Sequence, residues 1–362
     1  MSKNNRTVFV GMSGGVDSSV AAHLLKEQGY DVVGVFMKCY NIDGCAEADA
    51  EDARRAAEHI GIPFYVWDFE QEYKDRVVQY MIEGYRAGIT PNPDVMCNRE
   101  IKFGLFLEKA LASGADYVAT GHYVKIEKSA DGVFKLFEAA DSNKDQSYFL
   151  WTLGQKQLAY CLFPIGAYEK PRVREIARAA GLPTAEKKDS QGICFLGKFS
   201  LDDFLKQYIP EHRGALVTIA GEKIGEHSGA EFYTIGQRHI DADFAFPKAG
   251  VAGAERKPLY VASKDAATNT VTLAEGSDDP ALYRIEVELA QMNFISGTLP
   301  KAELPVRARV RYRQPLSDAI LSKFENGNYK LAFAKPQKFV AQGQSAVFYG
   351  SDREMLGGGI IL

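Results

Sequence analysis

No uninterrupted apolar run in this sequence is long enough to cross a lipid bilayer, so no membrane segment is predicted. The residues before position 7 are polar and lead directly into a short apolar run, and we therefore expect no signal peptide. Cysteine is scarce: there are five in 362 residues, an odd number that is typical of a protein of the reducing cytoplasm. None of them forms a C-x-x-C pair, so we expect no structural zinc site and no other resident metal.

A strong excess of one charge is also missing. The formal net charge is −4, which argues against indiscriminate binding to nucleic acids. If the chain binds RNA, its positive charge has to be concentrated locally. The length of 362 residues predicts two or three domains.

The first half alternates between short apolar strands and helices. Strands are predicted at 7–11, 31–37, 64–68 and 116–120, and helices at 17–28, 46–59, 70–86, 98–113 and 171–180. This alternation predicts an α/β fold with a doubly wound parallel sheet, in which ligands bind beyond the carboxyl ends of the strands.

The second half has the pattern of a β protein. Short alternating runs occupy 215–220, 231–235, 258–262, 270–274, 284–289, 306–313, 331–333 and 346–349. We expect a small β-rich middle domain followed by a C-terminal β-barrel. The predicted domains are 1–200, 201–278 and 279–362. The first boundary lies where the β-type pattern begins, and the second lies at the stretch 276–280, which is polar and rich in turn residues.

The most informative segment follows the first strand. Residues 11–19 read Gly-Met-Ser-Gly-Gly-Val-Asp-Ser-Ser and precede a predicted helix. The N–H groups and dipole of a helix N-terminus favour an anion, and Gly14 and Gly15 allow the backbone to approach it closely. No lysine follows the glycines, so this is not a Walker-type loop. The order resembles the pyrophosphate loop of ATP pyrophosphatases; a tight turn before a helix is the alternative.

Two other positions lie at strand ends. Met37 ends the second predicted strand, and Gly121 and His122 follow the fourth. We expect these residues to converge with the glycine loop on one nucleotide pocket. The alternatives are core packing for Met37 and a hydrogen-bonded loop histidine for His122.

Two cysteines stand in distinctive segments. Cys97 follows Thr-Pro-Asn-Pro-Asp-Val-Met and is predicted at or just before a helix N-terminus, where the pKa of a thiol falls. Asp94 could transfer a proton there. Cys194 lies in a glycine-framed loop, Asp-Ser-Gln-Gly-Ile-Cys-Phe-Leu-Gly, with Lys187 and Lys188 nearby. Together the two thiols could pass on a sulfur and end as a disulfide. The alternative for each is a buried structural cysteine.

An arginine-rich segment marks the last third. Arg307, Arg309, Arg311 and Arg313 alternate with other residues, so on a strand they would share one face and could follow a phosphate backbone. The alternative is a strand paired with acidic neighbours such as the run around Glu286. A polar turn at 144–147 is a smaller candidate for RNA contact, with a helix cap as its alternative.

These segments occur in the order found in tRNA-specific 2-thiouridylases, and the resemblance covers nearly the whole chain. It rests on the stretches 11–19, 90–103, 120–123, 144–150, 189–197, 236–238 and 311–313. The segment 340–344 departs from the family in lacking a proline before its Gly-Gln pair, and Gln344 stays in register.

The resemblance implies an adenine nucleotide alpha hydrolase-like fold and ATP-dependent 2-thiolation of the wobble uridine of tRNA. It implies ATP, with Mg²⁺, at Gly11, Met12, Ser13, Gly14, Gly15, Val16, Asp17, Ser18, Met37 and Gly121. Cys194 would take sulfur as a persulfide from a carrier protein, Cys97 would attack that persulfide, and Asp94 would assist proton transfer. It implies contacts with tRNA at Asn92, Pro93, Asp94, His122, Lys144, Asp145, Gln146, Arg311, Tyr312 and Gln344.

Two other functions remain open at this point. An amide ligase of the ATP-pyrophosphatase group would use the glycine loop but would need neither both cysteines nor the arginine segment. A tRNA-binding sulfur-relay protein would use the cysteines without catalysis, and the intact loop at 13–19 argues against it. Some relatives that thiolate tRNA carry an iron–sulfur cluster, which the missing C-x-x-C pair disfavours.

Overall fold

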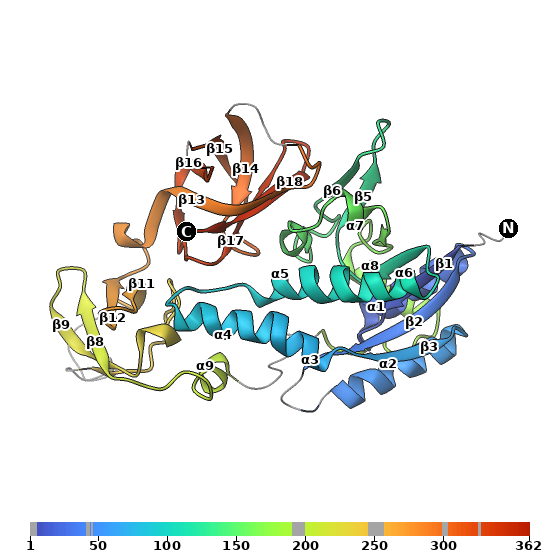
Figure 1. The fold of residues 1–362 in the computed structure, drawn as a ribbon, viewed down its shortest axis with the longest axis horizontal. Helices are drawn as coiled ribbons and strands as arrows, with labels where there is room; N and C mark the ends of the chain where they lie inside the picture. The colour runs from blue at the N-terminus through green and yellow to red at the C-terminus, as the bar shows by residue number, and fades with distance from the viewer. Residues whose placement is uncertain are drawn as a thin grey trace.

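The computed structural model describes residues 6–40, 44, 46–189, 200–244, 257–298, 303–324 and 327–362. Figure 1 shows an α/β unit at the N-terminal end, a small β unit at the opposite end, and a β-barrel above the helices that connect them. The predicted fold class is confirmed.

The α/β unit is built on a parallel sheet with the strand order β3-β2-β1-β4-β7. Its strands are β1 (Thr7–Gly11), β2 (Asp31–Lys38), β3 (Phe64–Asp68), β4 (Tyr117–Thr120) and β7 (Cys161–Leu162). Val8 and Val10 of β1 are buried against α1 (Val16–Glu27), α2 (Ala46–Ile60) and α8 (Lys170–Ala179). Phe9 between them is buried on the other face, against the helices of residues 70–112. Alternate residues thus enter two helical layers, as a doubly wound sheet requires.

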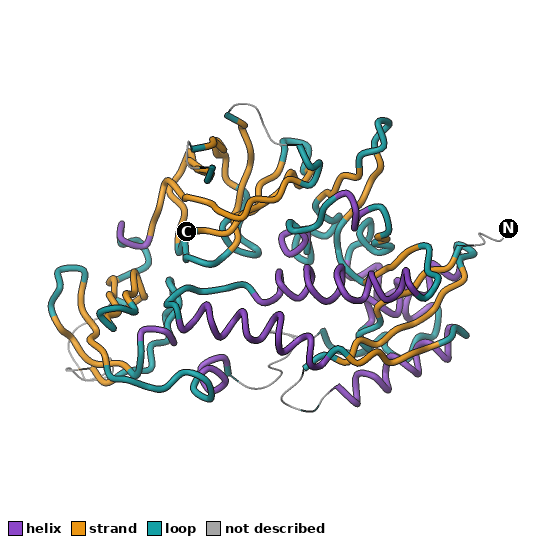
Figure 2. Tube along the Cα trace, in the orientation of Figure 1, coloured by secondary structure: helices purple, strands orange, loops and turns teal. Residues whose placement is uncertain are grey.

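Two long helical runs lie side by side through the centre of the molecule (Figure 2). The first comprises α3 (Glu70–Tyr73), the π-helical η1 (Lys74–Val78) and α4 (Gln79–Arg86), as predicted for 70–86. The second comprises α5 (Pro93–Cys97), the π-helical η2 (Asn98–Leu105) and α6 (Phe106–Ala112).

The second run begins five residues earlier than predicted. Asn92 caps it, because its Oδ1 accepts a hydrogen bond from the backbone N–H of Val95 at 3.2 Å, and Pro93 occupies the first turn. Cys97 therefore lies inside the helical run, and its predicted place at a helix N-terminus is wrong.

The second half forms two antiparallel-rich sheets. The smaller has the order β10-β9-β8-β12-β11, and in the larger β13 pairs with both β16 and β18, which closes a barrel of β13-β16-β15-β14-β17-β18. The small sheet contains β8 (Gly214–Thr218), β9 (Lys223–His227), β10 (Asp243–Phe244), β11 (Leu259–Asp265) and β12 (Thr270–Glu275). The barrel contains β13 (Tyr283–Phe294), β14 (Leu304–Arg309), β15 (Ser317–Lys323), β16 (Tyr329–Lys338), β17 (Ser345–Tyr349) and β18 (Glu354–Ile361).

One predicted strand, at 231–235, is wrong. The chain forms the 3-10 helix η4 (Ala230–Phe232), and its three consecutive residues are all buried, whereas a strand would expose every second one. The other short helices are η3 (Ser147–Leu150), α7 (Gln155–Leu158), α9 (Leu201–Leu205) and η5 (Pro280–Leu282).

A hairpin from the α/β unit joins the barrel. It consists of β5 (Lys125–Lys128) and β6 (Phe134–Phe137), and β6 pairs with β18. Just after β6, the buried carboxylate of Glu138 accepts hydrogen bonds from Arg309 and, at 2.9 Å, from Nε of Arg353. Strand pairing and this buried ion cluster therefore fix the barrel onto the first unit.

We predict that Glu138→Ala lowers the free energy of unfolding by about 3–5 kcal/mol, because it leaves the buried Arg309 guanidinium without its closest counter-charge. Urea unfolding measures this change. Glu51→Ala is the matched control: Glu51 also pairs with two arginines, but on an exposed helix surface, where about 1 kcal/mol or less is expected. Equal losses for both variants would contradict the assigned role of the buried cluster.

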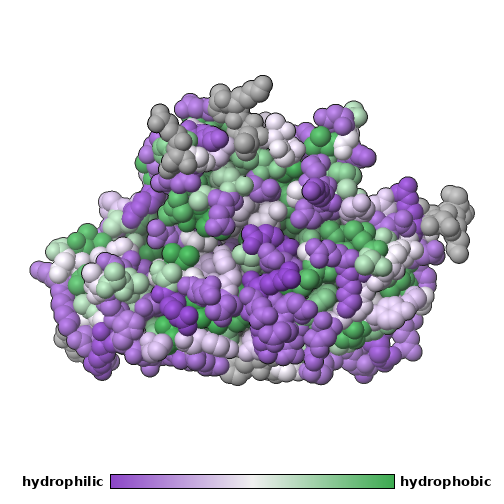
Figure 3. All heavy atoms as spheres, viewed as in Figure 1, coloured by the Kyte–Doolittle hydropathy of each residue, from purple (hydrophilic) through white to green (hydrophobic). Residues whose placement is uncertain are grey.

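No helix within the described residues combines the length and the apolar character needed to cross a membrane. The face in Figure 3 is mainly hydrophilic, with apolar side chains gathered in separate small patches.

Candidate active site

The glycine loop joins β1 to α1. Gly14 has a φ of +74°, and a Cβ built on it would lie 2.3 Å from the backbone oxygen of Asp49, so only glycine fits. The backbone N–H of Ser13 donates to Oγ of Ser18 at 3.1 Å, and Oγ of Ser19 donates to the carbonyl of Gly15 at 2.9 Å. Serine hydroxyls thus hold the loop in one conformation over the N-terminus of α1, which favours an anion there.

The sheet order brings the other predicted nucleotide residues to this loop. Since β1 lies between β2 and β4, Met37 at the end of β2 and Gly121 after β4 flank it. The Met37 methyl group lies 2.9 Å from a Cβ built on Gly11. A Cβ on Gly121 would lie 2.6 Å from the backbone nitrogen of Ser18, so the chain passes directly against α1. Met12 and Val16 are buried, and the backbone N–H of Met12 donates to the carbonyl of Val35 at 2.8 Å, which joins the loop to β2.

A charged network surrounds Asp17, and its main cation comes from a distant part of the chain. Nζ of Lys170 lies 2.8 Å from both carboxylate oxygens of Asp17 and 2.8 Å from Oδ1 of Asp189. Oη of Tyr123 donates to Asp17 at 2.7 Å. The sequence analysis did not identify Lys170. Its only local feature is that it precedes Pro171, the first residue of a predicted helix, and this does not indicate a partner.

The segment leading to Cys97 is held between the helices and the barrel. A Cβ on Gly84 of α4 would lie 2.7 Å from Pro91, so α4 passes close beneath the segment. From the barrel side, Nε2 of Gln344 donates to the carbonyls of Thr90 at 2.9 Å and Pro91 at 3.2 Å. Gln344, predicted to touch tRNA, therefore fixes the backbone beside Asn92.

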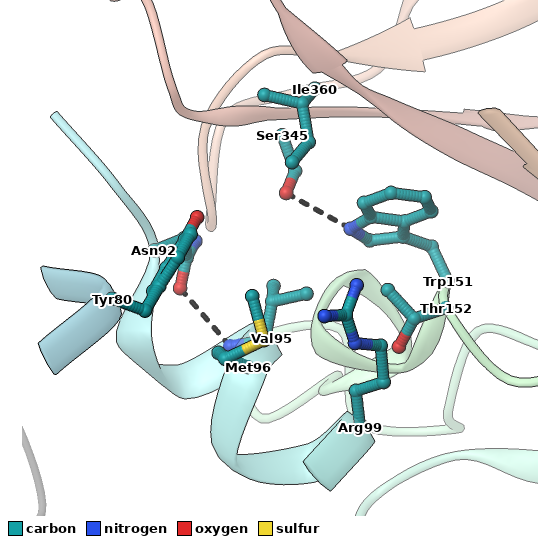
Figure 4. Close-up of a pocket in the computed structure, with 9 residues that line it drawn as sticks. All are labelled: Tyr80, Asn92, Val95, Met96, Arg99, Trp151, Thr152, Ser345 and Ile360. Carbon is teal, nitrogen blue, oxygen red and sulfur yellow. Dashed lines mark hydrogen bonds between the residues drawn. The ribbon is translucent and has the colours of Figure 1, made fainter. Parts of the chain in front are cut away.

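A small cavity lies next to this segment, between the helices and the barrel (Figure 4). Asn92, Val95 and Met96 line one side, and Trp151 and Ser345 the other; Nε1 of Trp151 donates to Oγ of Ser345 at 2.9 Å. Its volume of about 10 Å³ holds one water molecule at most, which is far too small for a nucleobase.

The environment of Asp94 and His122 favours their neutral forms. Burial raises the pKa of the Asp94 carboxyl, and the nearby Lys102 ammonium opposes this shift. Burial also holds the pKa of His122 well below its usual range, and Lys102 adds to that effect. The His122 ring contacts Phe103 of η2 at 5.8 Å between centroids, and its Nδ1 lies 2.6 Å from Oγ1 of Thr120. The histidine therefore connects the Cys97 helix with the strand end beside the glycine loop.

The cysteines differ in their placement. Cys97 is 6% exposed, within the core between the sheet and the two helical runs. Cys161 of β7 is also buried; burial raises the pKa of its thiol, and its Sγ donates to the carbonyl of Gln157 at 3.1 Å. Cys194 lies outside the described residues, so the predicted pairing with Cys97 stays a prediction.

Comparison with protein-family models divides the chain into three matched parts. Residues 6–198 match the "tRNA methyl transferase HUP domain", 202–275 the "tRNA methyl transferase PRC-barrel domain" and 284–361 the "Aminomethyltransferase beta-barrel domain". The tRNA-specific 2-thiouridylase MnmA of Streptococcus mutans is 47% identical over 367 residues, with 100% of this chain and 96% of that protein covered. The protein of the same name from Geobacillus thermodenitrificans is 47% identical, with 98% and 94% covered.

This chain belongs to the tRNA-specific 2-thiouridylase family. The full-length match with curated members of that name establishes the membership and confirms the resemblance carried by the motifs.

The polar turn that the family resemblance assigns to tRNA makes extensive contacts within the protein. Asp145 is 2% exposed and accepts hydrogen bonds from Ala139 N–H at 3.0 Å and from Oγ of Ser147 at 2.9 Å. Oε1 of Gln146 accepts from the backbone N–H of Tyr123 at 3.0 Å, and Nζ of Lys144 lies 2.5 Å from Asp189. These contacts position residue 123 and the charged network.

The prediction that four arginines share one strand face is wrong. β14 ends at Arg309, and the remaining two arginines lie in a turn, in which the N–H of Gln314 donates to the carbonyl of Arg311 and Arg313 has a φ of +63°. Arg309 is buried and paired with Glu138, and NH2 of half-buried Arg311 donates to the carbonyl of Ile235 at 2.6 Å. The alternative of a strand with acidic neighbours holds for Arg307, which lies opposite Asp318 of β15 with Nε 3.9 Å from Oδ1. Its example is wrong, because β14 pairs with β15 and β17 and not with the strand that carries Glu286.

Proposed function

We propose that this protein catalyses the ATP-dependent 2-thiolation of the wobble uridine of tRNA; its curated relatives are named tRNA-specific 2-thiouridylases. The observation that carries the proposal is that the glycine loop and the helical run containing Cys97 both pack against the residues that follow β4. The glycine loop packs against Gly121, and the helix that carries Cys97 and Phe103 packs against the adjacent His122.

In the first half-reaction, the glycine loop binds ATP and uridine O2 attacks the α-phosphate with release of pyrophosphate. The backbone N–H groups at the start of α1 face the phosphates. Mg²⁺ usually binds to phosphates and only one or two carboxylates, and Asp17, whose side chain is 31% exposed, fits that role. The metal would neutralise phosphate charge.

In the second half-reaction, Cys194 carries a persulfide obtained from a sulfur-carrier protein, and Cys97 attacks its inner sulfur. The two thiol sulfurs become a disulfide, and the sulfide that is released displaces AMP from C2 of uridine. In the other order, the persulfide attacks C2 first and Cys97 then breaks the S–S bond. Both orders leave sulfur in place of oxygen.

The remaining family-derived residues complete the proposal. Asn92, Pro93 and Asp94 would face the flipped uridine. His122, Lys144, Asp145, Gln146, Arg311, Tyr312 and Gln344 would form the region that meets tRNA. Since many of these side chains already contact protein groups, part of their role would be to position the segments that RNA touches.

The decisive experiment is mass spectrometry of tRNA nucleosides after incubation with the protein, ATP–Mg²⁺ and a persulfide donor. A sulfur-for-oxygen mass change confined to the anticodon uridine supports the proposal. The mass of an added methyl group would instead support the activity named in the family-model descriptions. Pyrophosphate release measured in parallel separates the alternatives: an amide ligase would not require tRNA, and a sulfur-relay protein would release none.

Asp94→Asn is expected to slow thiolation by about 10²–10⁴-fold, the usual contribution of a proton-transfer group. The carboxylate form accepts the proton, so the rate should fall as the pH drops through the Asp94 pKa. Burial raises that pKa, so this acid limb should lie above the usual range of an aspartate and vanish in Asp94→Asn. The pH–rate profile checks this, with exposed Asp75→Asn as control. A profile of unchanged shape in Asp94→Asn would contradict the role.

A further inference from the structure

A buried ammonium group lies against the glycine loop, although the loop contains no lysine of its own. Lys170 is the first residue of α8 and is 8% exposed. Its Nζ lies 2.8 Å from both oxygens of Asp17, the second residue of α1. The ammonium therefore lies at the N-terminus of α1, where the proposed function places the phosphates, although Lys170 is 153 positions along the chain from Asp17.

The position of this ammonium is fixed from several sides. The backbone N–H of Lys170 donates to Oδ2 of Asp141 at 2.9 Å, which holds the start of α8. The Nζ lies 5.8 Å from the centre of the Tyr123 ring, and the Tyr123 hydroxyl bonds to the same carboxylate of Asp17. Little side-chain freedom is left to lose when a ligand binds.

Asp189 has other cations beside it, and these allow Lys170 to leave Asp189 for another anion. Asp189 also pairs with Lys144 at 2.5 Å and with NH2 of Arg174 at 2.8 Å. If Lys170 released Asp189 to contact another anion, two cations would remain on that carboxylate. Lys170 is the cation shared between Asp17 and this group. It can turn toward a phosphate because Asp189 keeps two other cations, and Asp17, whose side chain is 31% exposed, keeps the Tyr123 hydroxyl and access to water.

We propose that Lys170 is the phosphate-binding cation of the nucleotide site, and this inference rests on the proposed function. During adenylation a bond forms between uridine O2 and the α-phosphorus, and the bond from that phosphorus to the β-phosphate oxygen breaks. The electron pair of the broken bond stays on pyrophosphate. Nζ of Lys170 neutralises the negative charge that develops there, which is the task a Walker lysine performs from within its own loop.

The test compares ATP with AMP, which lacks the two outer phosphates. Lys170→Gln keeps an N–H donor toward the carboxylates but removes the charge. We expect its affinity for ATP, measured by calorimetric titration, to fall about ten- to a hundredfold. Its affinity for AMP should stay at the parental value, and Lys170→Arg should recover most of the ATP affinity. Equal losses for ATP and AMP would show a merely structural role and overturn the inference, as would an unchanged ATP affinity.

Two further variants sharpen the result. Lys187→Gln is the matched control, because Lys187 also bridges two carboxylates, Asp49 and Asp52, at 2.7 and 2.6 Å, and should keep parental affinity. Asp189→Asn removes a competitor for Lys170 and should raise ATP affinity severalfold without changing AMP affinity. No gain there would overturn the inference even if Lys170→Gln failed to fold. If the parent protein released no pyrophosphate with tRNA, the proposed function would fail; a failure limited to these variants would concern Lys170 alone.

Discussion

Cys97→Ser is expected to lower 2-thiouridine formation on the order of a thousandfold or more while tRNA-dependent pyrophosphate release continues. A serine hydroxyl is a far weaker nucleophile toward sulfur than a thiolate, so a persulfide on Cys194 would form but not be passed on. The change adds no bulk in a position that is 6% exposed, and the glycine loop belongs to other elements. Adenylation should therefore persist.

The measurement combines labelled sulfur from a persulfide donor, denaturing gels for protein-bound label and nucleoside analysis for thiolated uridine. Cys97→Ser should retain label on the protein, and Cys194→Ser should show none. Cys161→Ser is the control, because a serine there can still donate to the carbonyl of Gln157, and its activity should be parental. Normal thiolation by both Cys97→Ser and Cys194→Ser would refute the sulfur-transfer mechanism.

Gly14→Ala is expected to reduce tRNA-dependent pyrophosphate release by about a hundredfold or more. Two costs coincide at this position. The φ of +74° is strained for alanine, and the new Cβ would lie 2.3 Å from the backbone oxygen of Asp49, which cannot move as a side chain tip would. The loop must therefore shift away from the geometry that presents its N–H groups to phosphate.

Gly221→Ala is the control for an alanine at a positive φ outside the glycine loop. Gly221 has a φ of +84°, but nothing lies within 4 Å of a Cβ built on it. This control should lose about 1 kcal/mol of stability and no pyrophosphate release. If both variants released pyrophosphate at the parental rate, the glycine loop would not be the nucleotide site. If both lost it equally, the effect would come from general destabilisation of the protein and not from the geometry of the glycine loop.

Local patterns in the sequence were sufficient for the architecture of both halves. The apolar run in 7–11 predicted a strand, and the order of strands and helices predicted the parallel sheet. Because the carboxyl ends of parallel strands share an edge, the meeting of Gly11, Met37 and Gly121 was also predictable. These features depend on period and order along the chain, which a single sequence contains.

The errors arose where local pattern and tertiary contacts disagree. The arginine alternation continued past Arg309, but the strand ends there, and the Arg309 guanidinium is buried against Glu138 from the other unit. Cys97 was predicted at a helix start, but the helix begins at Pro93 with Asn92 as its cap. In each case the deciding group was either a cap whose effect depends on backbone geometry or a partner far away in sequence.

What the sequence by itself determined is therefore the set of elements, their order and the motifs that place the chain in its family. Only the tertiary structure decided which polar groups meet: Lys170 pairs with Asp17, Arg309 pairs with Glu138, and Gln344 donates to the backbone before Asn92. The physical reason is that hydrogen bonds and ion pairs act over a few ångströms, and separations of 153, 171 and 254 positions leave no periodic trace along the chain.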